Sequence, residues 1–246
     1  MKKLLLLCGA LLLMSAAVAQ AAQLNIAWTN CTSDGGTADK TSACTSNSGS
    51  QTLVVSFVAP SGGIGQMSGA EAFLYLATSN GGAALPKWWD SFNSGTCRTS
   101  AITGNVVLPG TASNCLDAWS GIGVGGLIGY NENANGPGTV LVDMAAAVPS
   151  SSLQAIDDAD EYFLFNLKIA NTGTAGTACP GCLTPACILF HNLDVTQPVG
   201  VGDFHLTAAG PRTFATWQGG GVGNPGCPGA TPTNNKSWGA LKTLYR

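Results

Sequence analysis

Apolar and polar residues alternate along several short runs of this chain, as they do in strands that bury one face. The clearest run covers residues 161–170, where Phe163, Phe165, Leu167 and Ile169 share one face. Similar runs cover residues 51–59, 71–78, 139–145 and 186–195, with shorter ones at 23–28 and 212–217. Each run predicts a strand.

Glycine and proline clusters separate these runs, and no stretch of ten or more residues has a capped helical pattern. This organisation predicts an all-β chain: a single antiparallel β-sandwich, immunoglobulin-like or jelly-roll, braced by disulfides and carrying long loops rich in Gly, Ser and Thr. Short helices or 3₁₀ turns are expected at residues 86–92 and 115–119, and a long polar loop at residues 29–50.

The chain begins with a secretory signal peptide pattern. Lys2 and Lys3 precede an apolar run from Leu4 to Met14, and small residues follow. The run is too short to span a membrane, so residues 1–21 are predicted to be a cleaved leader and residues 22–246 a single domain. We therefore expect a protein that is secreted, extracellular or periplasmic, with no membrane span.

Of nine cysteines, one (Cys8) lies in the leader, and the other eight are predicted to form disulfides. Neighbours along the chain are the preferred partners, Cys31 with Cys44 and Cys97 with Cys115. The order of pairing is left open for the last four, Cys179, Cys182, Cys187 and Cys227.

The cysteine-rich stretch CPGCLTPAC at residues 179–187 has two alternative interpretations. With Cys227 it offers four thiolates for zinc or an iron–sulfur cluster, but only one closely spaced pair is present. A dithiol redox site needs its first cysteine at a helix N-terminus, whereas Pro185 and a strand pattern follow here. Structural disulfides are favoured, and no metal or cofactor is expected.

Two other patterns are weighed against enzyme sites. Residues 121–126 match G-x-G-x-x-G, but residues 127–137 cannot form the helix that a dinucleotide site requires, so a turn or bulged strand is predicted. His191 and His205 are the only histidines, and no G-x-S-x-G motif accompanies them. No catalytic triad is therefore assigned.

Carboxylates offer one route to catalysis, because glycoside cleavage needs two suitably spaced acids. The candidates are Glu71, Glu132, Asp143 and Glu161, and nothing around them marks a pair. The acidic stretch at residues 157–161 lacks the spacing of an EF-hand loop, so a solvated turn is preferred to a calcium site.

The adjacent Trp88 and Trp89 cannot face the same way on a regular strand. One of them is therefore expected to be exposed, where it would stack on a sugar ring. These two residues are the candidate ligand-binding residues of a carbohydrate-binding module.

Charged residues make up only 9% of the chain, and acidic residues outnumber basic ones by 13 to 10. The mild negative charge argues against nucleic-acid partners. A weakly charged surface instead favours self-association at the cell surface or a glycan partner.

Several motifs together resemble a group of exported bacterial proteins of uncharacterised function. They are Leu85-Pro-Lys-Trp-Trp89, the Cys179–Cys187 cluster, Thr216-Trp-Gln-Gly-Gly220, Cys227-Pro228 and the ending Trp238-Gly-Ala-Leu-Lys-Thr-Leu-Tyr-Arg246. The resemblance implies secretion and disulfides.

These observations predict a secreted or cell-surface module without enzymatic activity, structural or adhesive in role. A carbohydrate-binding module that uses an exposed tryptophan is the first alternative. A carboxylate-dependent hydrolase is the second.

Overall fold

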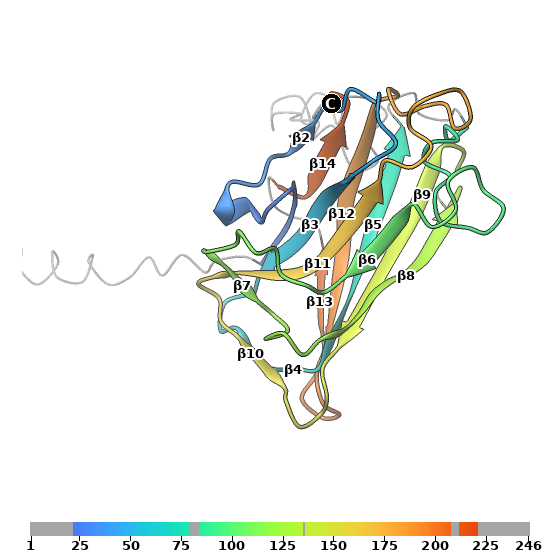
Figure 1. Ribbon diagram of the computed structural model, residues 1–246. Coiled ribbons are helices and arrows are strands. Elements are labelled where there is room, and N and C mark those ends of the chain that lie inside the picture. Colours follow the sequence, from blue (N-terminus) through green and yellow to red (C-terminus); the bar gives the residue numbers. More distant parts are fainter. Residues whose placement is uncertain (1–21, 79–83, 135, 208–211, 221–246) are drawn as a thin grey trace, which may run out of the picture.

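The computed structural model describes residues 22–78, 84–134, 136–207 and 212–220. The predicted leader, Cys227 and the C-terminal motif lie outside the described residues. Within the described ranges the chain consists of strands and one 3₁₀ segment, η1 (Thr32–Asp34), with no α-helix. The all-β prediction is confirmed (Figure 1). No helix in the described part of the chain is long and apolar enough to cross a lipid bilayer.

Three sheets form from these strands. The five-stranded sheet has the order β1-β3-β11-β6, and a short strand, β7, pairs in parallel with β11. Their bounds are β1 (Gln23–Trp28), β3 (Ser50–Val58), β11 (Glu161–Ala170), β6 (Ile102–Asn105) and β7 (Cys115–Asp117). Strands β3 and β11 are therefore interior strands, with neighbours on both sides.

The seven-stranded sheet has the order β2-β14-β12-β5-β9-β8, with β13 also paired to β12. Its strands are β2 (Asp39–Lys40), β5 (Gly69–Thr78), β8 (Val124–Glu132), β9 (Thr139–Ala147), β12 (Ala186–Thr196), β13 (Phe204–Thr207) and β14 (Phe214–Trp217). A separate two-stranded sheet joins β4 (Ile64–Met67) and β10 (Gln154–Ile156).

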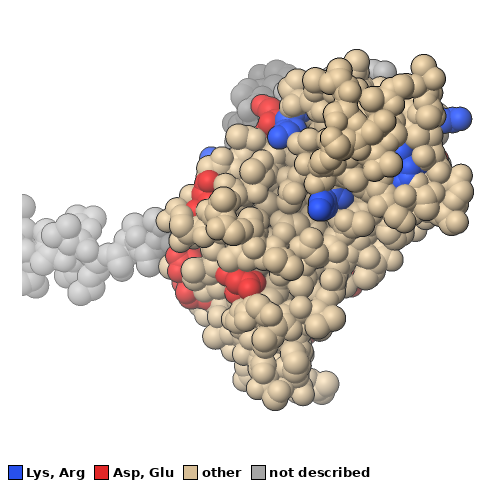
Figure 2. Space-filling view, in the orientation of Figure 1, with Lys and Arg blue, Asp and Glu red and all other residues tan. Residues whose placement is uncertain are grey.

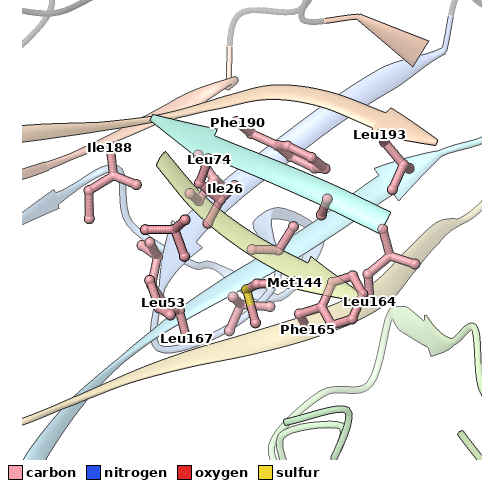
Figure 3. Packing of buried hydrophobic residues seen from close by; sticks show 14 of the residues in the cluster. Ile26, Leu53, Leu74, Met144, Leu164, Phe165, Leu167, Ile188, Phe190 and Leu193 are labelled. Carbon is pink, nitrogen blue, oxygen red and sulfur yellow. The ribbon is translucent and has the colours of Figure 1, made fainter. Parts of the chain in front are cut away.

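The two larger sheets contribute to one hydrophobic core. In Figure 3, Leu53 and Leu167 of the five-stranded sheet lie across from Leu74, Met144 and Ile188 of the seven-stranded sheet. All five side chains are almost completely buried. Each such side chain contributes about 1.5–3 kcal/mol of hydrophobic stabilisation, so the alternation that predicted the strands also specifies which face each strand buries.

Two edge strands approach closely because glycines leave room for the backbone. A Cβ atom on Gly104 of β6 would lie 2.5 Å from the backbone nitrogen of Leu127 on β8. A Cβ on Gly126 would lie 2.4 Å from the carbonyl oxygen of Gly104. The G-x-G-x-x-G stretch therefore serves as a turn and a bulged strand, as predicted, with the register shift between Leu127 and Gly129.

All seven predicted strands are present, and the structure adds the short strands β2, β4, β6, β7, β10 and β13. At residues 86–92 the expected short helix or 3₁₀ turn is a turn and not a helix: the Trp89 N–H donates to the Pro86 carbonyl, three residues earlier, at 2.9 Å. At residues 115–119 the expected helix is replaced by β7 and a turn, because β11 offers a pairing edge to Cys115–Asp117.

The disulfides confirm oxidised cysteines and correct the predicted pairing. Cys31 pairs with Cys115, Cys44 with Cys182 and Cys97 with Cys179, with Cα–Cα distances of 5.7–6.1 Å. Cys187 is also disulfide-bonded. The preference for Cys31–Cys44 and Cys97–Cys115 was wrong because sheet pairing brings distant segments together. Three such bridges indicate an oxidising environment.

The long polar loop at residues 29–50 is ordered by those bridges. Cys31 fastens its start to β7, and Cys44 fastens its later part to the cysteine-rich segment. The segment between them also forms η1 and β2.

Candidate functional site

Trp88 and Trp89 are both fully buried, which corrects the prediction that one of them forms an exposed platform. Because the segment is a turn rather than a strand, both rings can point inward. The Trp88 ring stacks on Trp217 with 5.0 Å between ring centroids, and Trp89 meets both rings edge-on. No sugar ring can reach either side chain.

Arg98 closes this tryptophan cluster. Its guanidinium lies 3.9 Å from the centroid of the Trp88 ring, and its N–H groups donate to the carbonyls of Trp88, Ala170 and Thr172. Burial lowers the pKa of Arg98 to about 10, which leaves the side chain charged at neutral pH. Its charge is thus satisfied by carbonyl oxygens and an aromatic face, a structural arrangement.

Three of the four candidate carboxylates have an acidic neighbour in direct contact. Burial, the charge of Glu71 on β5 and a hydrogen bond to Glu71 together raise the pKa of Asp143 on β9 to about 6. Burial, a hydrogen bond to Asp90 and the charge of Asp90 likewise raise the pKa of Glu132. Carboxyl groups that share a hydrogen bond are closer than the roughly 5 Å or more that glycoside hydrolysis uses.

Glu161, the remaining candidate, is a buried anchor. Its carboxylate accepts hydrogen bonds from the Asn25 amide, the Ser56 hydroxyl and the Thr32 hydroxyl at 2.6–3.0 Å, and from the Ser33 backbone N–H at 2.7 Å. Although burial opposes ionisation, these hydrogen bonds lower the pKa of Glu161. The residue fastens η1 to the five-stranded sheet.

The other polar candidates have local partners. Asp157 accepts the N–H groups of Ala159 and Asp160 and the hydroxyl of Tyr162, which makes the acidic stretch a hydrogen-bonded turn. The His205 Nδ1 atom contacts the Asp194 carboxylate on the surface of the seven-stranded sheet. His191 lies on the same sheet, edge-on to Tyr75.

The cysteine-rich segment lines an open cleft of about 550 Å³ beside two disulfides. Its walls come from Cys44, Thr174, Gly176 and residues 179–185, and they include no charged side chain. With Cys179 and Cys182 both in disulfides, the segment is a cross-linked loop.

A second cleft, of about 610 Å³, lies on the outer face of the five-stranded sheet; we call it the polar cleft. Strands β3 and β11 form its floor, with Ser50, Gln51, Thr52, Asn166 and Lys168. One wall includes Thr29 and Lys40, and the other includes Asn105 and residues 107–110.

Strand register explains why the polar groups of the floor gather there. Asn166 and Lys168 are two positions apart on β11, so both point away from the core that Leu167 enters. Lys168 lies opposite Thr52 on β3, and Asn166 lies opposite Asn105 on β6. Alternation along one strand thus supplies both an apolar and a polar face.

Asn166 is the unusual residue of the polar cleft. It is 93% buried, yet its Oδ1 atom has no hydrogen-bond partner among the described residues. Its Nδ2 atom donates to the Val107 carbonyl at 2.6 Å and to Asn105 Oδ1 at 3.2 Å. Asn105 Oδ1 also accepts the Val107 N–H at 3.0 Å, which identifies it as the oxygen. The amide nitrogen of Asn166 is therefore the atom that faces Val107 and Asn105, and its Oδ1 atom is enclosed by protein without a partner.

The two walls of the polar cleft are tied to each other. The Cys31–Cys115 disulfide joins the chain beyond Thr29 to the chain beyond Gly110. Asp34 accepts the backbone N–H groups of Ser113, Asn114 and Cys115 at 2.9–3.1 Å. Burial opposes ionisation of Asp34, but these hydrogen bonds prevail and lower its pKa to about 2. The cleft is thus built between fixed segments.

The charge of the polar cleft is opposite to that of the whole chain. Lys40 and Lys168 line it, and no acidic residue does. Among the described residues neither lysine forms an ion pair. Figure 2 views this side of the molecule, with basic side chains in its upper half and most acidic side chains along its left side.

Sequence reasoning did not find this cleft. The alternation in residues 161–170 identified β11, and the polar positions on its outer face, Asn166 and Lys168, were the available signal. Their neighbours come from β2, β3 and the segment after β6, and only the folded chain brings these together.

Comparisons of the chain with protein-family models, curated proteins and solved structures found no match.

Proposed function

We propose that this chain is an exported adhesive module that binds a carbohydrate in the polar cleft without chemically altering it. The observation that carries the proposal is the polar cleft itself, a hollow of about 610 Å³ whose lining includes hydroxyl and amide residues and two lysines. A concave site with several such polar groups can bind the hydroxyl groups of a sugar.

Several features support the wider setting of the proposal. The predicted leader and the three disulfides fit an exported protein, as does the resemblance to exported bacterial proteins. The common core of the two larger sheets supports a single β-sandwich spanning residues 22–246, immunoglobulin-like or jelly-roll in type.

The lining of the polar cleft favours a carbohydrate over an apolar ligand. Ser50, Thr52 and Thr29 offer hydroxyl groups, and Gln51, Asn105 and Asn166 are amide residues. Such groups bond the hydroxyls of a sugar, while Val107, Leu108 and Pro109 present an apolar wall to its C–H groups.

Binding without turnover follows from the placement of the carboxylates. The Glu161 carboxylate is committed to hydrogen bonds from Asn25, Thr32, Ser33 and Ser56. The Glu71–Asp143 pair lies on the other large sheet. The polar cleft contains no acid or base that would cleave a glycosidic bond.

A glycan array and a reducing-sugar assay with residues 22–246 test this function. We expect binding to at least one polysaccharide and no release of reducing ends. Asn166→Ala should weaken binding about tenfold, because the Asn166 amide holds Asn105 and Val107 in place in the lining of the cleft. Asn171→Ala is the matched control, since Asn171 also bonds a backbone carbonyl, that of Ser48, but does not line the cleft.

Failure to bind any polysaccharide would contradict the proposed function. Equal loss of binding in both asparagine variants would place the ligand elsewhere. Release of reducing ends by the wild-type chain would show an enzyme instead.

A further inference from the structure

We infer that the ligand of the polar cleft is an anionic polysaccharide, whose hydroxylated rings carry carboxylate or sulfate groups. This inference rests on the proposed function and narrows it to one chemical class. It depends on two kinds of group in the lining of the cleft, hydroxyl side chains and the ammonium groups of two lysines.

The hydroxyl groups are those of Thr29, Ser50 and Thr52 in the lining of the cleft. A hydroxyl group can both donate and accept a hydrogen bond, so these residues can pair with the hydroxyl groups of sugar rings.

The donors are the ammonium groups of Lys40 and Lys168. An ammonium group has no acceptor, so it requires oxygen lone pairs, and charged oxygens bind it about twice as strongly as neutral ones. Two lysines without a carboxylate partner in the described residues line one cleft of a chain with net charge −3. The ligand therefore carries negative charge as well as hydroxyl groups.

A peptide fits these observations less well. Extended peptides commonly add to a free sheet edge, whereas the floor strands β3 and β11 already have partners on both sides. The cleft also lacks the aromatic or deep apolar pocket that would anchor a peptide side chain. Its shallow, hydroxyl-rich floor suits a chain of sugar rings.

The construction of the walls supports tight binding to a stiff polymer. The Cys31–Cys115 disulfide and the Asp34 hydrogen bonds hold both walls in place before the ligand arrives. A site ordered in advance loses less conformational entropy on binding.

The test compares anionic oligosaccharides with their neutral forms by titration calorimetry, using residues 22–246. One arm uses galacturonate, mannuronate and glucuronate oligomers and their methyl esters. The other arm uses sulfated oligosaccharides and their desulfated forms. We expect at least one anionic oligomer to bind at least tenfold more tightly than its neutral form, because a charge-assisted bond to each lysine is lost.

Lysine variants test whether the preference for charged oligomers arises in the polar cleft. Lys40→Gln with Lys168→Gln should weaken the anionic oligomer about tenfold and leave its neutral form unchanged. Lys87→Gln is the matched control, because Lys87 is exposed but does not line the cleft. The arm that responds identifies carboxylate or sulfate as the anion.

Three results would overturn the inference. Equal binding of charged and neutral oligomers would refute it while leaving the proposed function intact. If polyglutamate bound as tightly as the anionic oligosaccharide, the cleft would be recognising negative charge and not a sugar. The absence of binding to every oligomer would refute both the inference and the proposed function.

Discussion

Arg98 and Asn166 are both buried polar residues, and they differ in how their hydrogen-bonding groups are used. Arg98 is 98% buried and donates to three backbone carbonyls beneath the Trp88 ring. Asn166 is almost as buried, but it uses only its donors, and its Oδ1 atom is enclosed by protein without a partner. The first residue satisfies its charge with carbonyl oxygens, and the second leaves one acceptor unpaired beside the polar cleft.

The comparison shows why burial alone does not identify a functional residue. Other buried atoms of the described residues also lack a hydrogen-bond partner, but each has a local explanation. Asp90 and Asp143 face neighbouring carboxyl groups, and Trp89 Nε1 lies in the closed aromatic cluster. Asn166 lines the polar cleft, but its unpaired Oδ1 is enclosed by protein, so the residue contributes by holding Asn105 and Val107 in place.

Removing disulfides should give the largest change in the free energy of unfolding. Cys31–Cys115 and Cys97–Cys179 close rings of similar length, with sequence separations of 84 and 82 residues. Replacing either pair by alanine should lower the free energy of unfolding by about 4 kcal/mol. Only the first pair ties the walls of the polar cleft, so only its loss should weaken glycan binding. Chemical denaturation and calorimetry would measure the two effects separately.

Equal loss of affinity in both disulfide variants would contradict the distinction between the two regions. The loss would then reflect general destabilisation.

Arg98→Met should lower the free energy of unfolding by about 3 kcal/mol, because three carbonyl groups lose a charged donor in a buried place. Glycan affinity should stay within twofold of wild type. Denaturant unfolding under non-reducing conditions measures the change. Arg212→Met is the matched control, since Arg212 is exposed and should change stability by less than about 0.5 kcal/mol. A loss of glycan binding in folded Arg98→Met would show that the two regions are coupled.

Glu161→Gln should give a smaller effect that depends on pH. Hydrogen bonds hold the pKa of Glu161 below its ordinary value of 4.5, so its stabilisation is present above that value and is lost as the pH falls through the lowered folded-state pKa. At pH 7 the variant should be less stable by about 2 kcal/mol. The difference should shrink as both proteins are acidified, which urea unfolding at several pH values would reveal.

A constant difference between Glu161→Gln and wild type at every pH would contradict this account. It would mean that the charge of Glu161 does not contribute to anchoring η1.

Much of the architecture could be predicted from local pattern. The alternation of Phe163, Phe165 and Leu167 located β11, and glycine clusters located turns. Short strands such as β7 could not be predicted, because three residues carry too little periodicity and their pairing edge is supplied by β11. Trp88 and Trp89 were misplaced for a different reason: their exposure was argued from the geometry of a regular strand, whereas they lie in a turn that lets both rings point inward.

The sequence by itself determined the β-rich composition, the faces that the long strands bury and the reactivity of cysteines that an exported chain would oxidise. These properties follow from side-chain chemistry at nearby positions. Only the tertiary structure decided which cysteines pair, where the tryptophans lie and which polar groups meet in the polar cleft. These outcomes depend on which distant segments the fold brings together. Lys40, Asn105 and Lys168, for example, line one cleft although they are far apart along the chain, so no local signal predicts their meeting.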